Sequence, residues 1–175
     1  ARVLSPRLAT TLYGRIDSNT ADLYFSDLPE DRLIDPREPL GGAPGSLLHI
    51  HYFLNPAAGK TPIDDTACNV TIKHYVLAGV DASGSPVFGV YGGGGFLLPS
   101  GQPGSNVFGG SMREGTHRLL HATPGFTDAL GPSELSGKML AVRDDDAADL
   151  IGRKIRVLMR RLPAAPAPPP PEPTE

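Results

Sequence analysis

The sequence predicts an all-β protein, an antiparallel β-sandwich or partly closed barrel of about nine or ten short strands with one short helix near the C-terminus. Glycine and proline together make up 40 of the 175 residues, which favours turns and short strands over long helices. Several segments alternate apolar and polar residues with the period of two that is typical of half-buried strands. No alternation of strands with helical segments favours a parallel sheet, so we expect antiparallel pairing.

Composition and length predict one globular domain followed by a tail. The chain is 39% hydrophobic and 20% charged, with a net charge of -3, which is typical of a folded domain. Seven of the eleven residues from 163 to 173 are proline, a composition that favours a solvated polyproline II segment. We therefore expect a single β-rich domain at residues 1–162 and a disordered proline-rich tail at residues 163–175. The tail is interpreted as a spacer, with a docking peptide as the alternative.

The first half of the chain contains four predicted strands. Residues 13–17 and 20–28 flank a turn of Asp and Asn residues and form a predicted hairpin. Residues 29–45 include four prolines and are expected to be a long surface loop. Residues 47–54 and 68–78 follow as strands, and in the second of them Val70, Ile72 and His74 share one face.

The second half begins with a predicted turn at residues 80–86 and includes a region, residues 84–115, that holds eleven of the 21 glycines. Residues 123–137 are expected to be a loop. A short helix is predicted from Asp144 to Ile151, because acidic residues suit a helix N-terminus and Gly152 suits its end. Strands are predicted at residues 87–91, 96–98, 106–112, 116–121, 138–143 and 153–162.

Several classes of function are disfavoured. The near-neutral charge provides no electrostatic basis for nucleic-acid binding, and no apolar stretch is long enough for a membrane span. Cys68 is the only cysteine, so no intrachain disulfide can form. No G-x-S-x-G motif is present, and no complete catalytic motif replaces it, so a soluble non-enzymatic protein is favoured. No signal peptide is visible; the compartment is left open, with the cell envelope slightly favoured over the cytoplasm.

The histidine pair His49 and His51 is the strongest candidate for chemistry. Two residues at i and i+2 on a strand share a face and lie about 6.6 Å apart, so their imidazoles can converge on one ion. Copper or zinc is the implied metal. Further ligands would have to come from other strands or loops, and the candidates are His117, His121, Asp64 and Asp65. The alternative is that both histidines are ordinary polar residues on an exposed face, with no cofactor bound.

Four consecutive glycines, Gly92, Gly93, Gly94 and Gly95, stand out in the glycine-rich region. In a sheet, such a run indicates a bulge or a place where another backbone approaches closely. The alternative is a loop where a ligand approaches the bare backbone, which makes these glycines candidate binding residues.

The function that these observations favour is a binding or structural module that recognises a protein or glycan partner through loops on a rigid sheet scaffold. The first alternative is a metal-binding protein or metalloenzyme built on His49 and His51. The second alternative is a small-molecule binder that uses the interior of a β-barrel. The sequence does not indicate an oligomeric state.

Overall fold

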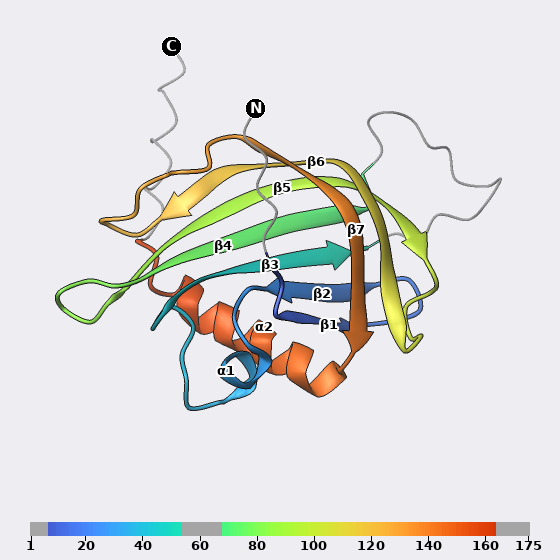
Figure 1. The fold of residues 1–175 in the computed structure, drawn as a ribbon, viewed down its shortest axis with the longest axis horizontal. Helices are drawn as coiled ribbons and strands as arrows, with labels where there is room; N and C mark the ends of the chain where they lie inside the picture. The colour runs from blue at the N-terminus through green and yellow to red at the C-terminus, as the bar shows by residue number, and fades with distance from the viewer. Residues whose placement is uncertain (1–6, 54–67, 164–175) are drawn as a thin grey trace, which may run out of the picture.

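A computed structural model describes residues 7–53 and 68–163, which form seven strands and two helices (Figure 1). In chain order these are β1 (Thr10–Arg15), β2 (Ala21–Ser26), α1 (Glu30–Ile34), β3 (Pro44–Tyr52), β4 (Val70–Val80), β5 (Pro86–Ser100), β6 (Val107–Ala122), β7 (Ser133–Arg143) and α2 (Asp145–Met159). The predicted all-β class is confirmed. Most of the proline-rich tail, from residue 164 on, lies outside the described residues.

The seven strands form one closed barrel in sequence order. Each strand pairs antiparallel with the next. The barrel closes through a parallel contact between β1 and β7, in which Leu12 lies opposite Val142 and Tyr13 opposite Arg143. Strand pairing therefore decides between the two predicted architectures in favour of a barrel. At the closing seam two residue pairs are joined by a backbone hydrogen bond of 2.9 Å from Asp144 N–H to the oxygen of Tyr13.

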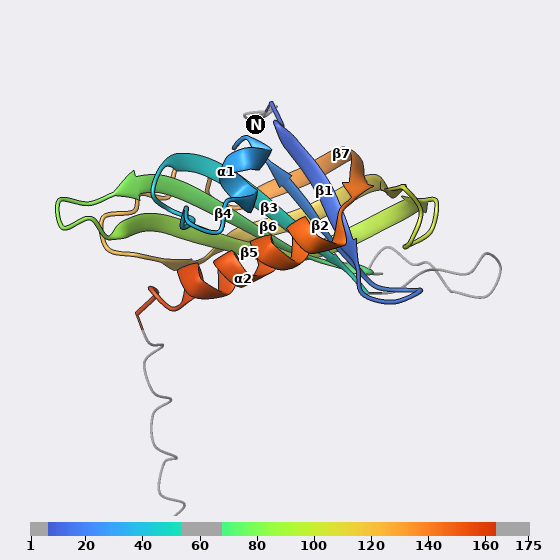
Figure 2. The ribbon, with the colours of Figure 1, turned by 90° about the horizontal axis from the view of Figure 1, so that it is seen from below.

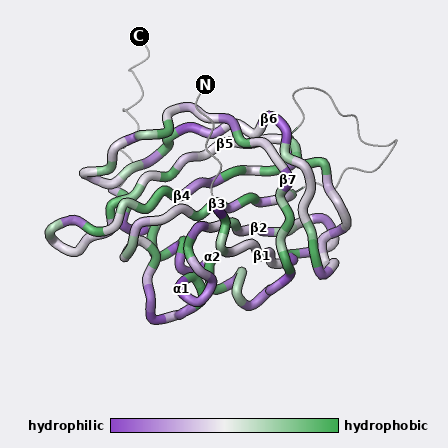
Figure 3. Tube along the Cα trace, viewed as in Figure 1, coloured by the Kyte–Doolittle hydropathy of each residue, from purple (hydrophilic) through white to green (hydrophobic). Residues whose placement is uncertain are grey.

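Apolar side chains form two clusters, one on each side of the barrel wall. The inner cluster includes Phe25, Ile50 and Ile72, whereas the outer cluster includes Tyr75 and is covered by α2. Figure 2 shows α2 lying along the outside of the strands, and Figure 3 shows apolar and polar residues following one another along them. Both faces of some strands are therefore buried, because successive side chains point to opposite sides of the wall.

The predicted final strand at residues 153–162 is wrong, because α2 continues through that segment to Met159. The start of the helix was predicted correctly: Asp144 is the N-cap, and its side chain accepts a hydrogen bond of 2.9 Å from the backbone N–H of Ala147. The predicted end at Gly152 is wrong. A Cβ atom at this position would lie 3.3 Å from the hydroxyl of Tyr24 on β2, so the glycine lets the helix lie close to the barrel.

The glycine-rich region forms long strands where short ones were predicted. Gly92 to Gly95 lie within β5, which has 15 residues, and β6 has 16. The register with β6 shifts between Gly94 and Phe96, as the bulge interpretation requires. A Cβ atom on Gly93 would lie 1.7 Å from the backbone oxygen of Thr116. The interpretation of these glycines as a bulge and a close backbone approach is therefore confirmed. The predicted number of strands is too high for the described residues, because the strands continue through the glycines.

Two predicted loops contain regular structure. Helix α1 lies in the predicted loop of residues 29–45, where its Leu33 is fully buried in the outer cluster. Strand β7 begins at Ser133, inside the predicted loop of residues 123–137. Within the described part of the chain, neither helix combines the length and the apolar character needed to cross a lipid bilayer.

Candidate functional site

Three rings from three neighbouring strands meet on the inner side of the barrel wall. His74 on β4 lies two residues beyond Ile72 of the inner cluster, so its side chain also faces inward. His74 is paired with Tyr91 on β5, and Gly93, two residues further along β5, is paired with His117 on β6. The strand register therefore places these three side chains together.

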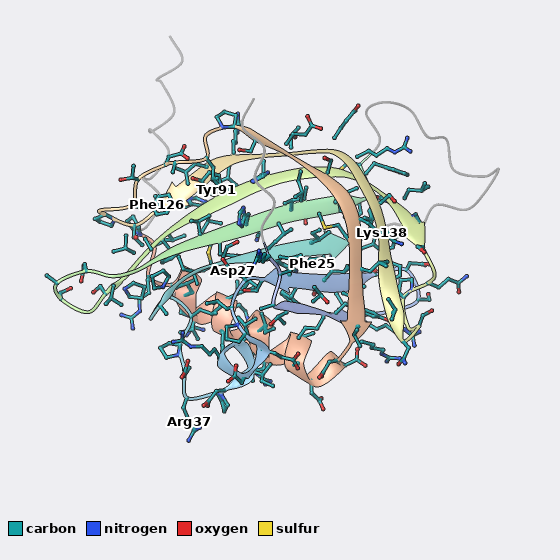
Figure 4. The ribbon with its side chains drawn as sticks, viewed as in Figure 1. Phe25, Asp27, Arg37, Tyr91, Phe126 and Lys138 are labelled. Carbon is teal, nitrogen blue, oxygen red and sulfur yellow. The ribbon has the colours of Figure 1, made fainter. Side chains whose placement is uncertain are left out.

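The distances between ring centroids define a compact cluster. His74 and His117 are 5.5 Å apart, Tyr91 and His117 are 5.9 Å apart, and His74 and Tyr91 are 6.1 Å apart. A fourth ring, Phe126 from the segment after β6, lies 6.4 Å from Tyr91 in an edge-to-face arrangement. Figure 4 shows Tyr91 and Phe126 at the same end of the barrel. We call these four residues the ring cluster.

Both histidines of the ring cluster are held in the neutral form. Burial, and then the charge of the neighbouring His117, lowers the pKa of His74 from its ordinary 6.5 to about 4. Nε2 of His74 shares a hydrogen bond of 2.8 Å with the hydroxyl of Ser46 on β3. Burial also lowers the pKa of His117. At neutral pH these imidazoles therefore act as hydrogen-bonding groups without a charge.

His117 is the residue whose bonding is incomplete. It is only 8% exposed, and its Nδ1 is buried with no hydrogen-bond partner among the described residues. A buried polar atom without a partner costs about 1–3 kcal/mol, so such atoms are rare in folded proteins.

Tyr91 connects the ring cluster to the segment between β6 and β7. Its hydroxyl donates a hydrogen bond of 2.5 Å to Oδ1 of Asp128. The same oxygen accepts bonds from the backbone N–H groups of Leu130 and Gly131. Burial, followed by the bond to Asp128, raises the pKa of Tyr91 to about 12, so the phenol remains protonated. The carboxylate thereby fixes the segment that carries Phe126 against the barrel.

A pocket of about 510 Å³ lies beside His117. Its walls come from β5, β6 and the beginning of β7. They are formed by Gly92, Gly93, Thr116, His117, Arg118, Pro132, Ser133 and Glu134. Two of the four glycines singled out in the sequence therefore line the pocket, and of these Gly93 is exposed whereas Gly92 is buried.

The predicted histidine pair lies on the other side of the barrel wall. His49 Nε2 and His51 Nδ1 each donate a hydrogen bond of 2.8 Å to Oδ1 of Asp22 on β2. Burial raises the pKa of Asp22, but the bonds and charges of the two histidines outweigh it, so the pKa is lowered overall. The ring of His49 also stacks on Tyr24 at 4.8 Å. Asp22 was not singled out in the sequence, although its position opposite His51 follows from the β2–β3 register.

Of the other proposed metal ligands, the two histidines are not brought to this pair. His117 faces the inside of the barrel, His121 is exposed on β6, and β3 and β6 are not neighbours. Asp64 and Asp65 lie outside the described residues. Across residues 7–53 and 68–163, no group of three or more His, Cys, Asp or Glu side chains is placed to hold a metal ion. The copper or zinc hypothesis stays a prediction.

Sequence reasoning missed most of the ring cluster. His117 was named, but as a metal ligand, and Ser46, Tyr91 and Phe126 were not named. Alternation along the strand did predict that His74 shares a face with Ile72. The missing information was the register of β4, β5 and β6, which determines that His74, Tyr91 and His117 are neighbours.

The neutral histidines predict a fall in stability in mild acid. In the unfolded chain the pKa of His74 returns to its ordinary value of 6.5. Between pH 6.5 and about 4 the unfolded chain therefore binds a proton that the folded chain does not. The free energy of unfolding should therefore fall by about 2 kcal/mol between about pH 7 and pH 5 from this residue alone. Urea unfolding at a series of pH values measures the slope. We expect His74→Gln to flatten it and His121→Gln, at an exposed position, to leave it unchanged; an equal slope in all three proteins would contradict the assignment.

Comparisons of this chain with protein-family models, with curated proteins and with solved structures found no match.

Proposed function

We propose that this protein binds a small organic molecule in the pocket beside His117, with the side chain of His117 as part of the binding surface. The observation that carries the proposal is the pocket of about 510 Å³, whose walls include His117 and the exposed backbone of Gly93. A small molecule in the pocket would pack against these two residues. Of the alternatives from the sequence, the proposal takes up the small-molecule binder, with a pocket whose walls include outward-facing as well as inward-facing residues.

The size of the pocket supports a small ligand. Ligand pockets commonly have volumes of about 300–1,000 Å³, with mostly apolar walls and a few polar groups that fix orientation. The volume of about 510 Å³ falls in this range. The protein or glycan partner predicted from the sequence stays a prediction, and Gly92 to Gly95 no longer support it as a recognition loop because they form part of β5.

Binding is favoured over catalysis by the acid–base properties of the cluster. The hydrogen bond of 2.8 Å between Ser46 and His74 resembles half of a nucleophile–base pair. However, a histidine whose pKa is lowered to about 4 is a weak base at neutral pH. Tyr91, with a pKa raised to about 12, is a weak acid at neutral pH. Neither group has the pKa near the working pH that efficient proton transfer requires.

The proposal is tested by a fragment screen that follows the protein's histidine ring signals by NMR. We expect some uncharged aromatic or alicyclic fragments to shift the signals of His74 and His117 and to leave those of His49 and His51 in place. His117→Leu should weaken these hits at least about fivefold, because His117 forms part of the pocket wall; a fivefold change corresponds to about 1 kcal/mol. His121→Leu, on the same strand but exposed, is the matched control and should bind as the wild type does. A screen in which no fragment shifts the inner histidines, or in which both variants bind equally well, would overturn the proposal.

A further inference from the structure

We infer that the free edge of β7 pairs with the same edge of a second copy of this chain, which makes the protein a two-fold symmetric dimer. The inference does not depend on what the pocket binds. It is carried by the part of β7 that no described strand pairs with, by the direction of the backbone groups there and by two charged side chains at complementary positions.

The seam between β1 and β7 covers only the end of β7. This strand has 11 residues, from Ser133 to Arg143, and β1 pairs with the last two of them. Figure 1 shows the contact near the arrowhead of β7. Within the described part of the chain, all other pairs of β7 are with β6, which lies on its opposite side. Residues 133–141 therefore form an edge of the sheet, which we call the β7 edge.

Two backbone hydrogen bonds determine where the groups of the β7 edge point. The N–H of Arg143 donates a bond of 2.9 Å to the oxygen of Asn106, on the β6 side. The N–H of Asp144 donates a bond of 2.9 Å to the oxygen of Tyr13, on the β1 side. Successive residues of a strand direct their backbone groups to opposite edges, so every second residue before Asp144 shares its direction. The residues whose N–H and C=O groups point out of the β7 edge are Glu134, Ser136, Lys138 and Leu140.

The middle of the β7 edge is open to solvent. Ser136, Gly137 and Lys138 are exposed in succession. In β4, which has a neighbour on both sides, buried and exposed residues largely alternate instead. An exposed edge of this kind offers its unpaired N–H and C=O groups to another strand.

The charges along the β7 edge select an antiparallel pairing centred on Ser136. In this register Ser136 lies opposite its own copy, and Glu134 lies opposite Lys138 of the second copy on both sides of the two-fold axis. Opposite charges on directly opposed residues stabilise an antiparallel pair. A two-fold axis at Lys138 would instead place two lysines opposite each other.

Both charged side chains are available for this pairing. Glu134 and Lys138 lie on the outer face of the wall, because Met139 and Ala141 belong to the inner cluster. Neither takes part in an ion pair within the described residues. Charged residues on an edge strand discourage pairing with unrelated strands. A second copy is therefore favoured over a foreign peptide, because it brings the complementary charges in the same register.

The register also fits the length of the free edge. It pairs residues 133–139 of the two copies, so the second copy ends opposite Met139 and does not reach Val142, where β1 is paired. Pro132, which has no N–H group, precedes the strand and limits the pairing. The outward backbone groups of the paired residues form about six hydrogen bonds across the interface. We expect a weak dimer, since one strand pair is smaller than a standard protein interface.

The experiment measures the monomer–dimer equilibrium of the whole protein by sedimentation velocity at low salt, from about 10 μM to about 1 mM protein. We expect the dimer fraction to rise with concentration. Glu134→Lys and Lys138→Glu should each weaken association about tenfold, because each replaces two attractive pairs by two repulsive ones. The double variant Glu134→Lys/Lys138→Glu exchanges the two charges and should associate as the wild type does. Lys73→Glu, at an exposed position on β4, is the matched control and should leave the equilibrium unchanged.

Hydrogen exchange followed by NMR tests whether the β7 edge is the contact. The amides of Ser136 and Lys138 should exchange at least about tenfold more slowly in concentrated than in dilute samples, because pairing protects them only in the dimer. The amide of Met139, which points to β6, should change little between the two samples.

Three outcomes would overturn the inference. The first is a protein that stays monomeric up to about 1 mM; slow exchange at Ser136 and Lys138 in that monomer would assign the β7 edge to another segment of the same chain. The second is a dimer that neither single charge reversal weakens, and the third is a dimer that the double variant does not restore.

Discussion

Replacing Gly93 by alanine is expected to destabilise the barrel by more than about 3 kcal/mol or to prevent folding. A Cβ atom at this position would lie 1.7 Å from the backbone oxygen of Thr116 and 2.9 Å from the Cα of His117. Both contacts are with the backbone of β6, so no side-chain rotation can relieve them. The strands β5 and β6 would have to separate at the point where they position the ring cluster. Urea unfolding of the purified variant measures the loss, and soluble yield is the readout if the variant does not fold.

Two other glycines are matched controls for this substitution. In Gly92→Ala the new Cβ atom meets mainly the side chain of Leu120, which is half exposed and can move, so we expect a loss of about 1 kcal/mol or less. In Gly42→Ala the nearest atom is 3.8 Å away, and we expect a change within about 0.5 kcal/mol. If Gly93→Ala were as stable as Gly92→Ala, the close approach of the β6 backbone would be refuted.

Truncating Leu158 to alanine is expected to cost about 2–5 kcal/mol, the usual range for a buried leucine. Leu158 is 2% exposed and packs in the outer cluster together with Ile151 and Ile155, its neighbours on one face of α2. Truncating the adjacent Val157, which is 52% exposed, is expected to change the free energy of unfolding by less than about 0.5 kcal/mol. Denaturant unfolding of the two variants measures both values.

This pair of variants also distinguishes helix from strand. In the strand predicted from the sequence, Ile155, Val157 and Met159 would share the buried face, so Val157 would be the sensitive position and Leu158 the tolerant one. In the helix the order is reversed, because residues three and four apart share a face. A larger loss from Val157→Ala than from Leu158→Ala would contradict α2.

Local patterns in the sequence are sufficient to predict the secondary-structure class and several features of individual elements. The alternation along residues 68–78 predicts a strand with Ile72 and His74 on one face, and β4 has this arrangement. The acidic run at Asp144 predicts the start of α2, because an N-cap acts through a hydrogen bond only three residues long. These features depend on residues close together in the chain, so local physical rules are sufficient to predict them.

Where the spacing of apolar residues fits both a strand and a helix, tertiary packing decides which of the two forms. Residues 153–159 suit a strand through Ile155, Val157 and Met159, and a helix through Ile155 and Leu158. The outer face of the barrel needs an apolar cover, and α2 supplies it with Ile151, Ile155 and Leu158. The structure of Gly92 to Gly95 is also decided by tertiary packing. Glycines form strands weakly, but these four become part of β5 because the neighbouring backbones of β4 and β6 come close.

Barrel closure and the candidate site were decided by the tertiary structure alone. The closing contact joins Leu12 to Val142, which lie far apart along the chain. No local pattern in the sequence encodes a pairing between such distant residues. The ring cluster likewise requires β4, β5 and β6 to pair in one register, since a shift by one residue would turn His74 or His117 to the outer face. The register of these strands depends on how all the side chains of the inner face pack together. The sequence therefore identifies the residue types of the site, whereas only the folded barrel brings them together.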